Sequence, residues 1–130
     1  MASVDITDNF DEARNELNAA IERALIQCGM IAEGYAKLLC PVDTGRLRGS
    51  IVYATSTSHS EGESPAEPED YTPKGTPPKG EVIIGTNVEY GPSVELGTSK
   101  RKAKPFLRPA IENHSSEYKE IIESELKGQN

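Results

Sequence analysis

The sequence predicts an α+β fold: a long N-terminal helix, a small antiparallel sheet with a long disordered hairpin loop, and a C-terminal helix. Three observations predict this order. Apolar residues recur at helical spacing over residues 10–39, β-branched residues cluster at 49–56 and 81–86, and a second helical pattern ends the chain. A chain of 130 residues has the size of one domain, so residues 1–130 are expected to form a single unit.

The first helix is predicted to run from Phe10 to Leu39. Thr7 or Asp8 is expected to cap it, and Pro41 to end it, because proline disfavours helical geometry in the residue before it. Its apolar positions recur at spacings of three and four residues: Leu17, Ile21, Ala24, Cys28, Ile31, Tyr35 and Leu38. Such a stripe is typical of a helix with one buried face.

The predicted helix is long for its domain. At about 1.5 Å per residue it would measure roughly 45 Å, whereas a compact domain of 130 residues is about 36 Å across. The helix therefore either overhangs its domain or bends at Gly29 or Gly34. We favour the overhang, with the extra apolar stripe packed on a neighbouring copy. The candidate interface residues of this stripe are Leu17, Ile21, Ala24 and Cys28.

The segment after the helix, PVDTGRLR, predicts a turn formed by Asp43, Thr44, Gly45 and Arg46. Asp43 and Arg46 could bond across it and fix the angle between helix and sheet; an ordinary surface turn is the equal alternative. Asp-Thr-Gly is also the string of retroviral-type aspartic proteases. That string belongs between hydrophobic strands, and here it follows a helix and runs into Arg46. A turn is therefore predicted, and no enzyme.

Residues 57–80, between the two predicted strands, differ in composition from the rest of the chain. They hold five of the nine prolines and an acidic run without a basic residue: Glu61, Glu63, Glu67, Glu69 and Asp70. Such a segment buries too little apolar surface to offset its ordering entropy, so we predict a flexible hairpin loop. The acidic run is the candidate for a docking segment that orders on binding.

The last third of the chain begins with strand formers mixed with Gly and Pro over residues 88–98, which predicts a bent segment at the edge of the sheet. Pro105 and Pro109 both suit a helix start, and the last helix is expected to run to about Leu126. Its apolar positions are Ala110, Ile111, Tyr118, Ile121, Ile122 and Leu126.

Five basic residues gather just before the last helix: Lys100, Arg101, Lys102, Lys104 and Arg108. A solvated loop is one interpretation. We prefer a docking patch for acidic surface on a neighbour, such as the acidic run of the next copy. A basic cluster at a helix N-terminus is unfavourable for that helix, and an acidic partner would offset it. The formal net charge of −7 disfavours contact with DNA phosphates.

The two cysteines, Cys28 and Cys40, lie about 18 Å apart along the predicted helix, too far for a disulfide. This indicates a reducing compartment. With His59 and His114, interpreted as solvated surface residues, they fall short of a structural zinc set, and no cofactor is expected. The start of the chain lacks the pattern of a secretory leader. No apolar run approaches the ~20 residues of a membrane helix, so a soluble protein made in the cytoplasm is expected.

Three strings along the chain carry a family resemblance. They are LLCPVDTGRLRGSI (38–51), VIIGTNVEYGPSVELGT (82–98) and KPFLRPAI (104–111). In this order they resemble the tail-completion or head–tail joining (neck) proteins of long-tailed bacteriophages, minor structural proteins of the lambdoid-phage type. Each string alone is modest, and the ordered trio is the more specific feature.

The resemblance implies a structural virion protein of a phage or prophage, located in the neck. Its copies would form a homo-oligomeric ring, a hexamer, that joins the DNA-filled head to the tail. The implied partners are further copies of the chain, the connector or adaptor proteins and the tail-tube proteins. DNA would pass through the ring without specific binding. A tail terminator ring and a host adaptor protein of the same fold are the alternatives.

Overall fold

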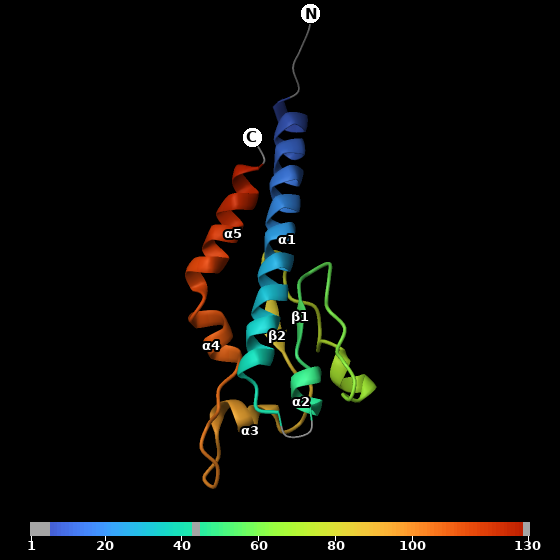
Figure 1. The fold of residues 1–130 in the computed structure, drawn as a ribbon. Helices are drawn as coiled ribbons and strands as arrows, with labels where there is room; N and C mark the ends of the chain where they lie inside the picture. Colours follow the sequence, from blue (N-terminus) through green and yellow to red (C-terminus); the bar gives the residue numbers. More distant parts are fainter. Residues whose placement is uncertain (1–5, 43–44, 129–130) are drawn as a thin grey trace, which may run out of the picture.

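The structure, a computed structural model, describes residues 6–42 and 45–128 (Figure 1). The helices and strands in chain order are α1 (Ile6–Leu39), α2 (Arg46–Gly49), β1 (Val52–Ala54), the 3-10 helix η1 (Pro68–Tyr71), β2 (Ile83–Gly85), α3 (Gly91–Leu96), α4 (Leu107–Glu112) and α5 (Ser115–Lys127). A long first helix, a small antiparallel sheet and helical structure at the end of the chain confirm the predicted α+β fold.

The first helix, α1, is 34 residues long and continues unbroken through Gly29 and Gly34. Figure 1 shows its N-terminal turns extending beyond the end of α5, so the helix overhangs its domain instead of bending. It ends at Leu39, as predicted, but it begins at Ile6. Thr7 and Asp8 therefore lie inside the helix, and the prediction that one of them caps it is wrong.

The sheet consists of β1 and β2, which pair antiparallel with Val52 opposite Gly85 and Ala54 opposite Ile83. Both strands are shorter than their β-branched runs. A two-stranded sheet is marginal in water by itself, and here it packs on α1. The Tyr53 ring lies so close to Gly29 that a Cβ at this glycine would stand 2.7 Å from Cδ2 of the ring. Gly29 thus permits the approach of the sheet to the helix.

The connection between the strands has little regular structure besides η1, and its first part is fastened to α1 by polar bonds. The hydroxyl groups of Thr55 and Thr57 each donate to the Glu22 carboxylate at 2.5 Å. Further along, the Ser60 hydroxyl donates to Glu33. Composition does not predict these contacts, because they join the loop to polar side chains of α1 and not to buried apolar ones. The flexibility of the loop stays a prediction.

We expect this anchor to make the stability of the protein depend on acidity. Burial by itself raises the pKa of Glu22, but the bonds from Thr55 and Thr57 outweigh it, and the pKa lies below its ordinary value of 4.5. A carboxyl whose pKa is lowered by folding stabilises the protein above its unfolded-state pKa, and this contribution is lost as pH falls through the folded-state pKa.

The measurement is urea unfolding of the natural chain and of the variant Glu22→Gln, near neutral pH and well below pH 4.5. The variant should be the less stable protein near neutral pH, and the difference should shrink in acid. An equal difference at both pH values would remove the role of the carboxylate charge.

The segment 88–98, predicted as a bent segment at the edge of the sheet, instead forms the short helix α3 over Gly91–Leu96 and does not join the sheet of β1 and β2, so this prediction is wrong. Pro92 stands in its first turn, where a missing N–H costs nothing, and Gly97 follows its end with φ of +78°. Val94, a strand former, is buried in the core from this helix. Burial of one side chain has outweighed β propensity here.

The predicted last helix is two helices, α4 and α5, separated by a turn at Asn113 and His114. The His114 ring is half-buried and stacks on the ring of Tyr35, with 3.5 Å between the centroids and 4° between the planes. The Tyr35 hydroxyl also donates to Glu117 at 2.6 Å. His114 is therefore part of the joint between α1 and α5, and its interpretation as a solvated residue is wrong.

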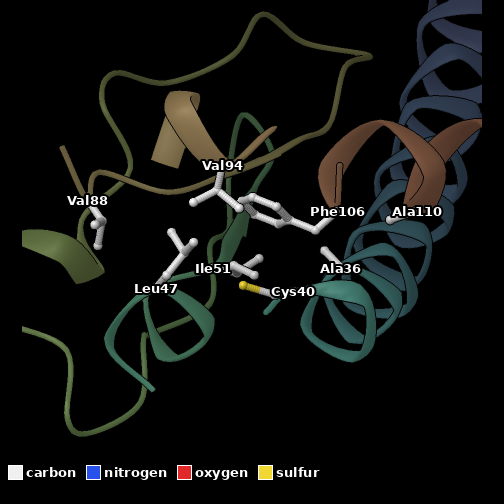
Figure 2. Close-up of a cluster of buried hydrophobic side chains, with 8 residues drawn as sticks. All are labelled: Ala36, Cys40, Leu47, Ile51, Val88, Val94, Phe106 and Ala110. Atoms are coloured by element: carbon white, nitrogen blue, oxygen red, sulfur yellow. The ribbon is translucent and has the colours of Figure 1, made fainter. Parts of the chain in front are cut away.

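The core lies at the C-terminal end of α1 (Figure 2). Its buried side chains come from six parts of the chain: Ala36, Cys40, Leu47, Ile51, Val88, Val94, Phe106 and Ala110. Phe106 is fully buried, and its ring reaches from the start of α4 toward Val94. The core therefore ties α3 and α4 to the end of α1 and leaves the overhanging end of α1 outside it.

Candidate functional site

The turn predicted to carry structural weight lies only partly within the described residues. Asp43 and Thr44 fall outside them, so a bond between Asp43 and Arg46 stays a prediction. Gly45 has φ of +81°, a conformation that favours glycine, and Arg46 begins the short helix α2. The described part of the Asp-Thr-Gly string thus leads into a helix, whereas the protease framework requires strands on both sides.

Arg46 fastens three separate segments to one another. Its Nε donates to Oδ2 of Asp70 at 2.9 Å and its Nη2 to Oδ1 at 3.3 Å. The same guanidinium donates to both carboxylate oxygens of Glu89, at 3.1 and 3.2 Å. The bonds with Asp70 and then those with Glu89 raise the pKa of Arg46. Arg46 therefore stays charged and holds η1 and the turn before α3 against α2.

Asp70 accordingly differs from the other members of the predicted docking run. Its side chain is 1% exposed and also accepts a hydrogen bond from the Glu67 backbone N–H at 3.0 Å. Because Asp70 is bonded inside its own chain, it does not present a carboxylate to a partner, and its place in the docking run is a wrong prediction. The remaining members are exposed: Glu61, Glu63, Glu67 and Glu69.

The apolar stripe predicted as a subunit interface is largely covered by the chain itself. Figure 1 shows α5 lying back along α1. Ala24 is 0% exposed and Cys28 is 5% exposed, with the Cys28 thiol near the backbone oxygen of Tyr118 at 3.8 Å. The assignment of Ala24 and Cys28 to a subunit interface is therefore wrong. Ile21 is half-buried, and Leu17, at 46% exposed, remains open near the overhang.

All five predicted basic residues are exposed, in the segment between α3 and α4 and in the first turn of α4: Lys100, Arg101, Lys102, Lys104 and Arg108. The start of α4 already has an acidic partner from the same chain. The Glu95 carboxylate accepts hydrogen bonds from the backbone N–H groups of Phe106 at 3.0 Å and Leu107 at 2.7 Å. The basic cluster therefore needs no neighbour to offset its effect on this helix.

The carboxylate of Glu95 is a cap that the sequence did not reveal. Replacing Glu95 by alanine leaves the backbone N–H groups of Phe106, Leu107 and Arg108 without this acceptor, and should lower the free energy of unfolding by about 1 kcal/mol. Chemical denaturation measures this loss. Glu112→Ala is the matched control, because Glu112 is an exposed carboxylate that pairs only with Arg108 in its own helix. Equal effects of the two changes would contradict the capping role.

A cavity of about 300 Å³ lies beside the basic segment. Tyr90 and three apolar side chains form one part of its lining, and basic side chains form another. The lining residues are Pro41, Gly45, Leu47, Tyr90, Val94, Arg101, Lys102 and Lys104. We call this cavity the basic pocket. It offers apolar surface and positive charge side by side, which suits an acidic segment with an apolar side chain.

The thiols are the strongest nucleophiles in the described chain, and their environment keeps them protonated. Burial raises the pKa of Cys40 to about 11 against a small lowering effect of Arg48, and burial also raises the pKa of Cys28. Both are free and buried, so they are unreactive at neutral pH. Within the described residues, no His, Cys, Asp and Glu side chains gather as a metal site. None of the described helices is long and apolar enough to span a membrane.

Comparison with known proteins gives one match. A family model described as "Bacteriophage HK97-gp10, putative tail-component" matches residues 5–97. No curated protein and no solved structure matches the chain. The matched range extends from α1 to the end of α3, so the basic segment, α4 and α5 follow it.

Proposed function

The chain belongs to the HK97-gp10-like family of bacteriophage tail components, and on that premise we propose that it is a ring subunit of the phage neck. In this role its copies join the DNA-filled head to the tail. It works through its surfaces and turns over no substrate. The neighbours of the ring are the connector or adaptor proteins of the head on one side and the tail-tube proteins on the other.

The observation that carries this proposal is the placement of opposite charges on two sides of one small fold. Glu67 and Glu69 are exposed on η1, which projects to one side of α2, and the segment with Lys102 and Lys104 projects on another side (Figure 1). A closed ring needs two different faces on each subunit that complement each other head-to-tail. Acidic and basic faces on one chain supply such a pair, and a hexamer is the proposed closure.

The overall charge supports a ring through which DNA passes without being bound. A protein that holds duplex DNA neutralises phosphates with basic residues, and the net charge here is −7. Several basic side chains outside the exposed patch are paired within the chain, as Lys37 is with Glu63 at 3.2 Å and Arg46 with Asp70. The remaining exposed acidic surface would repel the DNA backbone and let it slide.

Electron microscopy of phage particles made without this gene tests the proposal. We expect DNA-filled heads and finished tails that lie apart, and joined particles when the gene is supplied from a plasmid. Tails of uncontrolled length would instead identify a tail terminator ring. Intact, infectious particles made without the gene would exclude a virion role. A host adaptor protein would then be the remaining alternative.

A further inference from the structure

We propose that the basic pocket of each copy receives the segment Glu67–Pro68–Glu69 of the next copy in the ring. We call this segment the acidic tip. The inference rests on the proposed neck ring and deepens it, because it names the two surfaces that close the ring. The occupant of the pocket is a second copy of this chain.

The acidic tip is built to project. Glu67, Pro68 and Glu69 are all exposed at the start of η1. Next to them, Asp70 is buried and held by Arg46, so the short helix cannot turn away from the body of the protein. Asn87 adds a side-chain bond to the backbone oxygen of Glu69 at 3.3 Å. These contacts reduce the conformational entropy that the segment loses on docking.

The basic pocket has the chemistry to receive this tip. Tyr90 and apolar side chains such as Val94 offer a surface against which a proline ring packs well, as in aromatic-lined grooves that bind proline-rich segments. Lys102 and Lys104 are exposed at the same cavity and form no ion pair with the residues that the structure describes. A proline between two glutamates therefore matches an apolar surface flanked by two ammonium groups.

The two surfaces cannot meet within one copy while the bond between Arg46 and Asp70 holds. η1 and the segment between α3 and α4 extend in different directions from α2 (Figure 1). Contact between the tip of one copy and the pocket of another is therefore heterologous, and repetition of such a contact generates a ring when the rotation closes.

Charge reversal tests this contact in phage that lack the gene and receive it from plasmids. One variant, Lys102→Glu with Lys104→Glu, makes the pocket acidic; the other, Glu67→Lys with Glu69→Lys, makes the tip basic. Each variant alone should lower the yield of infectious particles by about tenfold or more, because like charges then meet at every contact. Both variants expressed together should restore the yield, since an alternating ring places opposite charges at every contact.

The controls separate this contact from folding and from the neck role. Lys119→Glu with Lys127→Glu reverses two exposed charges on α5 and should leave the yield unchanged. Thermal unfolding must show both test variants folded; if either is unfolded, Lys102→Ala with Lys104→Ala and Glu67→Gln with Glu69→Gln take their place, and each alone should again lower the yield.

Two outcomes would overturn the inference: a full yield from either variant alone, and failure of the two variants together. If the tip variant gives the full yield and the pocket variant fails, the pocket is assigned to an acidic segment of another neck protein. In both cases the neck role stands if loss of the gene still leaves heads and tails apart; particles that join without the gene would remove the proposed function itself.

Discussion

Replacing Phe106 by alanine is expected to lower the free energy of unfolding by about 4 kcal/mol. Phe106 is the largest fully buried side chain among the residues that the structure describes. Its ring fills the space between the end of α1, α3 and α4 (Figure 2). Truncation removes the apolar contacts and leaves a cavity that three elements would have to move to close.

Urea or guanidinium denaturation measures this loss, with Leu96→Ala as the matched control. Leu96 is 78% exposed, so its truncation should leave the midpoint nearly unchanged. Phe106 lies beyond residues 5–97, which match the family model. A large loss would show that the C-terminal segment is part of the same cooperative unit as the matched part. A loss below about 1 kcal/mol would mean that α4 is not packed as described.

Gly29 and Gly34 both lie in α1 but have different surroundings, so replacing each by alanine should change the stability of the protein in opposite directions. At Gly29 an added Cβ would stand 2.7 Å from Cδ2 and 2.9 Å from Cγ of Tyr53. Both atoms are at the base of a buried ring, which cannot swing away, so Gly29→Ala should cost about 2 kcal/mol. At Gly34 an added Cβ would meet no atom within 4 Å apart from the backbone of its own helix and its chain neighbours, so Gly34→Ala should stabilise the helix by about 0.8 kcal/mol.

Thermal or chemical unfolding of the two variants, measured side by side, checks this pair. Both substitutions improve helix propensity equally, so their difference isolates the contact with the sheet. Gly29→Ala should cost less in the Tyr53→Ala background than in the natural chain, because the obstructing ring is then absent. If both variants were stabilised, the close approach of β1 to α1 would be refuted.

Periodic patterns predicted the elements of this fold that are long or regularly spaced. The C-terminal end of α1 at Leu39 followed from the proline after it, and both strands lie within their β-branched runs. Pattern failed where a single buried residue decided the local structure. Val94 is buried from a helical turn, although the strand formers around it predicted a bent segment at the edge of the sheet. Much of the predicted stripe of α1 is buried, but Leu17 and Leu38 are exposed, and the cover is α5 of the same chain.

The bonds that position the candidate surfaces could not be predicted, because each joins residues with no local relation in sequence. Arg46 and Asp70 are separated by a loop whose composition indicates flexibility, and only the folded chain brings them to 2.9 Å. Glu95 caps α4, a helix that begins twelve residues after it. The exposed acidic and basic runs themselves were visible in the sequence. The sequence did not show which residues of these two runs remain available to a partner, because that depends on bonds between residues far apart in the chain.

The C-terminal helix α5 contains no buried residue, although it covers the stripe that includes Ala24 and Cys28. Its far end is attached to α1 through polar bonds, from Gln27 to Glu125 at 2.6 Å and from Arg23 to Glu125 at 3.4 Å. Segments with few buried contacts open locally at a smaller free-energy cost than global unfolding. Amide hydrogens of α5 should accordingly exchange with solvent earlier than those around Phe106, and the thiol of Cys28 becomes accessible to alkylating reagents in states where that of Cys40 is still enclosed.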